Sequence, residues 1–125
     1  MGADTGIVWF LRSTEEDLGK VRLISLEGRV SHATASDVAG ALAGSQENGR
    51  QAVIVDLSGV DYINGAGLQV FETAAARLST LGSELVICGL RPAVQAVFDL
   101  AGSIPNLTTE LSRDSALRRF ERTGT

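Results

Sequence analysis

The sequence predicts an α/β domain built on a small mixed β-sheet, with its elements in the order ββαβαβαβα. Continuous, mainly apolar runs that contain β-branched residues, at 52–57 and 84–88, are typical of central strands covered on both faces. Segments with apolar residues at helical spacing follow these runs, which favours parallel strands joined by right-handed crossovers. Two strand-like segments near the N-terminus have no helix between them, so we expect an antiparallel hairpin there.

The predicted hairpin opens the chain. Residues 7–11 form its first strand because they are apolar and rich in β-type side chains, and the polar residues 15–19 form its turn. The second strand, 21–26, carries apolar residues on both faces and is closed by Gly28. At least one face of this strand should therefore be covered by other elements.

Helices and strands alternate from there on. A helix is predicted from Thr34 to about Glu47, where Asn48 and Gly49 supply the usual chemistry of a left-handed cap. The strand 52–57 comes next. The later elements are a helix with the apolar stripe Leu68, Phe71, Ala75 and Leu78 that ends at Gly82, the strand 84–88, a helix opened by Arg91-Pro92 and followed by Gly102, a weaker strand at 107–111, and a last helix capped by Ser112.

Length and composition indicate one ordinary globular domain spanning residues 1–125, with 1–4 and 123–125 as loose ends. The net charge is −4, and the one basic cluster, near the C-terminus, is interleaved with acidic residues. This argues against nucleic acid, which needs a basic stripe. We expect no secretory signal and no membrane insertion, because no apolar run is long enough. The expected location is the cytoplasm, with Cys88 as a buried thiol.

The groups needed for catalysis or metal binding are scarce. His32 is the single histidine of the chain, and no Cys–His or His–His spacing suggests a metal site. The segment around Gly65 and Gly67 lacks the third glycine of a dinucleotide fingerprint, and no P-loop lysine follows any glycine-rich stretch. We therefore expect no cofactor, no metal and no enzymatic activity.

The most distinctive stretch is VDYINGAGLQVF, residues 60–71, where a strand pattern runs directly into a helix pattern. Asn64 is suited to cap the helix by accepting from its first free N–H groups. Gly65, Ala66 and Gly67 leave that helix start bare, with open donors and the positive end of the helix dipole. Such a start suits an anion, a phosphorylated side chain or a close protein surface. The residue chemistry equally fits a tight strand-to-helix turn with no ligand.

The segment Asp56-Leu57-Ser58-Gly59-Val60-Asp61-Tyr62-Ile63-Asn64-Gly65-Ala66-Gly67-Leu68 resembles the signature of the STAS domain, as found in bacterial anti-sigma factor antagonists. That signature reads D-L-S, a short spacer, then I-D-S-S-G-L. Further matches follow in the family's order at Leu26–Val30, Leu81–Val86, Arg91–Val94 and Asp114–Leu117. The resemblance implies a small mixed sheet with helices packed on one side.

The resemblance also implies a regulatory, non-catalytic protein that binds an anti-sigma factor, often a histidine-kinase-like ATPase, and so frees a sigma factor. In the family, the partner kinase phosphorylates the first serine of D-S-S-G and breaks the complex. Here Asn64, Gly65 and Ala66 stand where the family has Asp, the phosphorylated Ser and the second Ser. Because glycine has no oxygen to phosphorylate, the usual switch cannot operate at Gly65, the degenerate phosphoacceptor position.

We therefore expect a partner-binding surface that has kept its shape and lost its chemical group. Its expected residues are Ser31, His32, Ser58, Asp61, Tyr62, Asn64, Gly65, Ala66 and Gly67. The turn at Ser31 and His32 is included because it should open on the same sheet edge as the helix start. Alternatives are a STAS subunit of a lipid-transport ABC complex or of a stress-signalling scaffold, and a small-molecule or nucleotide sensor. Homodimerisation is left open.

Overall fold

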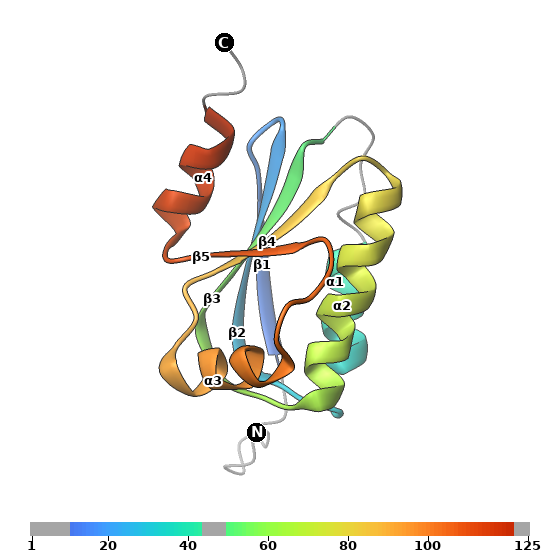
Figure 1. Ribbon diagram of the computed structural model, residues 1–125, viewed down its shortest axis with the longest axis vertical. Coiled ribbons are helices and arrows are strands. Elements are labelled where there is room, and N and C mark those ends of the chain that lie inside the picture. The colour runs from blue at the N-terminus through green and yellow to red at the C-terminus, as the bar shows by residue number, and fades with distance from the viewer. Residues whose placement is uncertain (1–10, 44–49, 122–125) are drawn as a thin grey trace, which may run out of the picture.

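A five-stranded mixed sheet in the order β1-β2-β3-β4-β5 forms the centre of the molecule (Figure 1). The computed structural model describes residues 11–43 and 50–121. β1 and β2 are antiparallel, and the pairs from β2 to β5 are parallel, as the sequence predicts. The elements are β1 (Leu11–Asp17), β2 (Val21–Val30), α1 (Ala35–Ala43), β3 (Ala52–Ile63), α2 (Gly65–Thr80), β4 (Glu84–Cys88), α3 (Pro92–Ala101), β5 (Leu107–Glu110) and α4 (Arg113–Glu121).

The first strand lies further along the chain than predicted. Of the expected strand 7–11, only Leu11 falls within the described residues, and the expected turn at 15–19 is wrong, because β1 continues through Asp17. Its residues pair with β2 in unbroken register from Leu11 opposite Gly28 to Asp17 opposite Arg22. Pairing with β2 therefore overrides the low β propensity of the acidic side chains, which point to solvent from an edge strand.

β2 and β3 continue past the residues expected to end them. Gly28, expected to close β2, instead sits within it at φ +125°, next to a shift in the pairing register. On β3, a Cβ at Gly59 would lie 2.9 Å from the Leu26 carbonyl oxygen, so the strands approach closely at that point. The glycines therefore absorb irregularities rather than ending the strands. As a result β2 and β3 finish together, with Val30 opposite Ile63.

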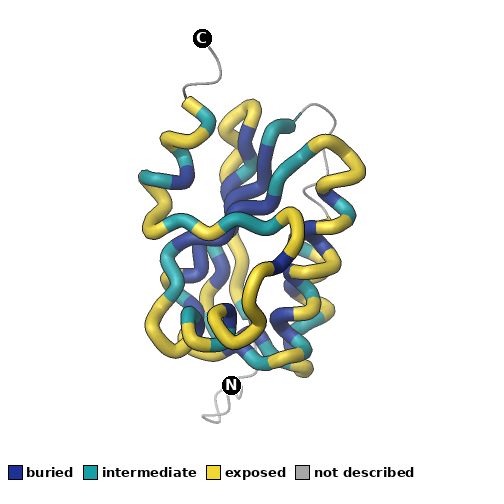
Figure 2. The backbone as a smooth tube through the Cα atoms, viewed as in Figure 1, coloured by how far each residue is buried: buried dark blue, intermediate teal, exposed yellow. Residues whose placement is uncertain are grey.

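Alternate residues of the strands feed two separate cores, and Figure 2 shows the buried segments running along the central strands. The larger core joins one face of the sheet to α1, α2 and α3, and includes the tilted ring pair Phe71 and Phe98. The smaller core lies on the other face, where α4 covers Leu23, Ile54 and Val86 with Ala116, Leu117 and Phe120. Three helices therefore share one side of the sheet as expected, and α4 is the exception, which Figure 1 shows across the sheet from α1 and α2.

Helix boundaries follow the local signals. α1 begins after Thr34, and its predicted end at Asn48 and Gly49 lies outside the described residues. α2 ends before Gly82, which has φ +77°, and α3 before Gly102 at φ +78°. The Ser112 hydroxyl accepts from the Ser115 amide at 3.1 Å, which confirms the predicted cap of α4. No helix in the described ranges is long and apolar enough to cross a membrane.

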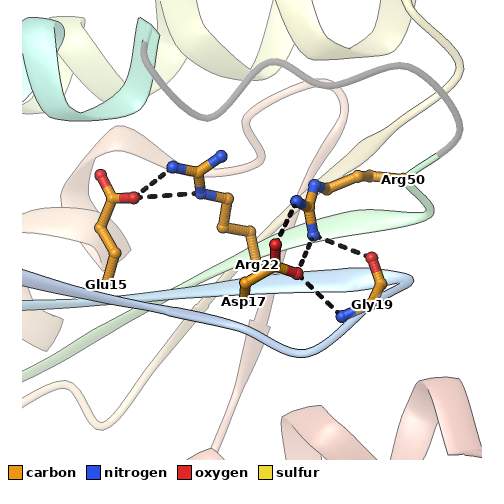
Figure 3. A network of polar contacts seen from close by, with 5 residues as sticks. All are labelled: Glu15, Asp17, Gly19, Arg22 and Arg50. Carbon is orange, nitrogen blue, oxygen red and sulfur yellow. Dashed lines mark hydrogen bonds and ion pairs between the residues drawn. The ribbon is translucent and has the colours of Figure 1, made fainter.

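A polar network ties the hairpin to the chain entering β3 (Figure 3). Arg50 donates to both carboxylate oxygens of Asp17, at 2.7 and 2.9 Å, and to the Gly19 carbonyl at 2.8 Å. Beside it Arg22 pairs with Glu15. The hydrogen bond from Arg50, followed by that from the Gly19 amide, holds the pKa of Asp17 well below its usual 3.8. The hairpin thus has a fixed position at the end of the sheet far from the start of α2.

Candidate partner-binding site at the start of α2

The ends of β2 and β3 bring the two expected parts of the site together. The Asn64 amide, directly after β3, donates to the carbonyl of Val30 at the end of β2 over 3.2 Å. A Cβ added at Gly67 would lie 2.6 Å from both Val30 Cγ1 and Val30 O. Only a glycine at 67 allows this approach, so the start of α2 is seated directly on the end of β2.

Asn64 caps α2 as predicted. Its backbone is extended, and its Oδ1 accepts from the Gly67 amide at 3.1 Å, while its carbonyl accepts from Leu68 at 2.9 Å. Leu68 is buried in the larger core and fixes the rotation of the helix about its axis. With that rotation, Gly67 faces inward and Gly65 is exposed.

Gly65 has an ordinary backbone and open space around it. It is not among the glycines with positive φ, and a Cβ built on it would meet nothing within 4 Å. The position therefore does not require glycine for steric reasons. The absence of a side chain at Gly65 therefore changes what the protein surface offers there and is not needed for folding.

The turn after β2 is held by Thr34, which the site prediction did not include. Thr34 is 1% exposed, and its hydroxyl donates to the Arg29 carbonyl at 2.6 Å and accepts from the Ser31 amide at 3.0 Å. Its carbonyl accepts from Val38 in the first turn of α1. Ser31 is half-buried within this turn and His32 is exposed beside it. A hydroxyl residue just before an apolar helical pattern was the available signal for Thr34.

Asp61 and Tyr62 lie on the final residues of β3 and are both exposed. The Tyr62 ring packs under the guanidinium of Arg29, its neighbour on β2, with 4.3 Å between Cζ and the ring centroid. This contact holds the ring of Tyr62, two residues before Asn64 in the chain, against Arg29. That Tyr62 and the start of α2 form one surface stays a prediction.

Ser58 lies apart from the rest of the predicted set. It lines a polar cavity of about 290 Å³, together with Asp56 and Arg113. Its amide donates to Asp56 Oδ1 at 2.9 Å, and its carbonyl accepts from Arg91 at 2.7 Å. We therefore leave Ser58 out of the site, because these contacts explain it as part of the framework.

Asp56 is the centre of that polar framework. Arg113, the first residue of α4, donates to Asp56 Oδ2 at 3.1 and 2.9 Å and to the Ser25 hydroxyl at 2.8 Å. Burial raises the pKa of Asp56, but the hydrogen bonds from Ser58 and Arg113 outweigh it, and the pKa falls below 3.8. Asp56 is thus an ionised anchor that attaches α4 to the sheet.

Metal-binding groups do not gather in the described part of the chain, where no three His, Cys, Asp or Glu side chains are placed to hold an ion. Cys88 is buried at the end of β4, and burial raises the pKa of its thiol to about 12. A thiol in this state is a poor nucleophile and a poor ligand.

Comparison with known proteins agrees with this geometry. Residues 14–116 match the sequence profile described as the STAS domain. The chain belongs to the STAS domain family. BtrV of Bordetella bronchiseptica, which carries the name of an anti-sigma factor antagonist, is 32% identical over 111 residues, covering 89% of this chain and 96% of that protein.

Solved structures of low sequence identity share the fold of this STAS domain. An anti-sigma factor antagonist from Mycobacterium paratuberculosis has a TM-score of 0.77 at 22% identity, covering 90% of this chain and 96% of that chain. The Bacillus cell fate determinant SpoIIAA, in its phosphorylated form, has a TM-score of 0.64 at 14% identity, covering 86% and 98%. The chain is thus an antagonist-like STAS domain over most of its length.

Proposed function

We propose that this STAS domain is an anti-sigma factor antagonist whose partner binding is not controlled by phosphorylation at the start of α2. The partner is an anti-sigma factor of the histidine-kinase-like ATPase type, met in the cytoplasm, and its capture frees a sigma factor. The domain acts by binding alone and carries out no catalysis. The docking surface consists of Ser31, His32, Asp61, Tyr62, Asn64, Gly65, Ala66 and Gly67.

The observation that carries this proposal is the surroundings of Gly65. The backbone around it is an exposed, well-capped helix start seated on the end of β2. Such a start lets a partner's backbone come close, because Gly65 and Ala66 offer almost no side chain. Two further points support the proposal: by the family resemblance Gly65 is expected to stand where the phosphorylated serine lies, and SpoIIAA has been solved in unphosphorylated and phosphorylated forms.

A phosphate in such a contact would act by charge and desolvation. A phosphate carries a charge of about −1.5 to −2. A partner packed closely against the helix start would strip water from this charge, which weakens the complex unless the partner supplies a pairing cation. With glycine at position 65 no such charge can be added there. The complex should therefore respond only to the concentrations of the two proteins.

Two measurements on the unmodified chain test this function. Isothermal titration with the kinase-like anti-sigma factor encoded in the same genome should show stoichiometric binding that ATP does not abolish. Intact-mass analysis after incubation with that protein and ATP should show no phosphate on residues 60–70. Absence of binding would refute the function, and a stoichiometric phosphate on Tyr62 would refute the loss of the switch.

A further inference from the structure

Helix α4 is attached to the domain through a core of its own. This core includes Leu23, Ile54 and Val86 of the sheet, and Ala116 is the one fully buried residue that α4 contributes. Five of the nine residues of α4 are charged, so apolar packing holds the helix only weakly. The larger core, on the other face of the sheet, is a separate cluster. Because the two cores share no residues, one can open while the other stays intact.

Ion pairs fasten α4 to the sheet near both of its ends. In the first turn, Arg113 donates to Asp56 Oδ2 at 3.1 and 2.9 Å and to the Ser25 hydroxyl at 2.8 Å. Nearer the end of the helix, Arg119 pairs with Glu84 at 2.7 Å. The side chain of Asp56 is 9% exposed, whereas that of Glu84 is 33% exposed. Since solvent screens an exposed pair more strongly, the pair between Arg113 and Asp56 should contribute the larger share of the attachment.

Cys88 lies next to this ion pair, under α4. It is fully buried in the smaller core, and in the sheet register it stands opposite Asp56 on the neighbouring strand. It is also the single cysteine of the chain. A thiol reagent can therefore reach it only when α4 has left the sheet or when the whole domain has unfolded.

We propose that α4 is a latch, which leaves the sheet as one unit while the sheet and the other three helices stay folded, and that the Arg113–Asp56 ion pair holds it closed. Its release uncovers an apolar face with Leu23, Ile54 and Val86, across the sheet from α1 and α2 (Figure 1). This inference does not depend on the proposed function, because the start of α2 packs in the larger core.

The test combines two measurements on the whole chain. Intact-mass analysis follows the alkylation of Cys88 by iodoacetamide near pH 8, and hydrogen exchange compares the amides of α4 with those in the buried turns of α2. In the wild-type chain alkylation should be slow, and α4 should exchange faster than α2. Arg113→Ala should speed alkylation by about tenfold or more, because charge-assisted hydrogen bonds are lost, while exchange in α2 changes by less than about twofold.

Arg118→Ala is the matched control. It makes the same change of charge and of helix propensity in the same helix, but Arg118 is exposed and its guanidinium has no ion pair or hydrogen bond among the described residues. Its alkylation rate should stay within about twofold of the wild type. Ser112→Ala is a second variant that leaves Asp56 paired. It removes the cap of α4, where the Ser112 hydroxyl accepts from the Ser115 amide, and should speed alkylation by about fivefold.

Three results would overturn the latch. One is exchange in α2 that rises as much as alkylation does in Arg113→Ala, because the ion pair would then hold the whole domain. Another is equal exchange of α4 and α2 in the wild-type chain, which would show a single opening event. The third is an alkylation rate in Ser112→Ala equal to that in Arg118→Ala, and this result decides the matter even if Arg113→Ala does not fold.

Discussion

Gly65→Asp is expected to weaken partner binding without lowering the stability of the domain. The new Cβ enters open space, and the backbone at this position is not in the glycine-only region. Replacing glycine in a helix contributes roughly 0.5–1 kcal/mol to stability. A carboxylate in the first turn adds about 0.3–1 kcal/mol through the helix dipole. The variant should therefore melt at the same temperature as the wild type or higher.

Binding should move in the opposite direction. In a dry contact the introduced carboxylate would be an unpaired charge, which costs several kcal/mol. A loss of about 2.7 kcal/mol corresponds to a hundredfold weaker complex, and we expect at least this change. Gly65→Ser is the matched control, because its hydroxyl is small and neutral, and it should bind within about threefold of the wild type.

The assay is titration calorimetry of both variants with the anti-sigma factor, after melting curves and circular dichroism have shown that each is folded. An unchanged affinity for Gly65→Asp would refute the placement of the interface over the start of α2. Equal losses for Gly65→Asp and Gly65→Ser would refute the electrostatic reasoning, since only one of them introduces a charge.

Three further predictions concern the framework. Gly67→Ala should destabilise the chain by about 1–3 kcal/mol, because the added Cβ meets Val30 at 2.6 Å, and a urea midpoint equal to that of the wild type would contradict this packing. The folded pKa of Asp17 lies below the unfolded 3.8, so its contribution to stability is complete well above pH 4 and is lost as pH falls below the unfolded pKa. Asp17→Asn should flatten that acid loss in urea titrations between about pH 5 and 2, and an unchanged pH profile would contradict the ion pair with Arg50. With a pKa near 12, Cys88 should resist iodoacetamide in the native chain near pH 8 and react once urea exposes β4; rapid native alkylation would show that its burial is wrong.

The sequence was most informative where one local signal acted alone. The β-branched run 52–57 and the Asn64 cap needed no knowledge of the tertiary fold, and both are confirmed. It failed where pairing decided the outcome. Polar residues 15–17 form a strand because β2 pairs with them, a long-range effect that no local pattern of acidic residues reveals.

The site shows the same division. The position of Ser31 and His32 beside Asn64 followed from topology, since adjacent parallel strands end at one edge. The separation of Ser58 from the other expected residues was harder to foresee, because neighbours in sequence point to different surroundings along a strand, and its contacts come from Arg91 and Asp56. The open groove between α1 and α2 could not be predicted from the sequence, because its width depends on how closely these two alanine-lined helices pack.

The open space at Gly65 has an evolutionary consequence. Glycine and serine codons can differ by a single nucleotide, and here neither residue would require any neighbour to move. Gly67, two residues later, has no such freedom, because any side chain collides with Val30. Under the proposed function, one mutational step adds or removes the acceptor hydroxyl at position 65, and neither form clashes with its neighbours. For engineers, position 65 is therefore a place where a hydroxyl can be added or removed by changing one codon, while position 67 must stay glycine.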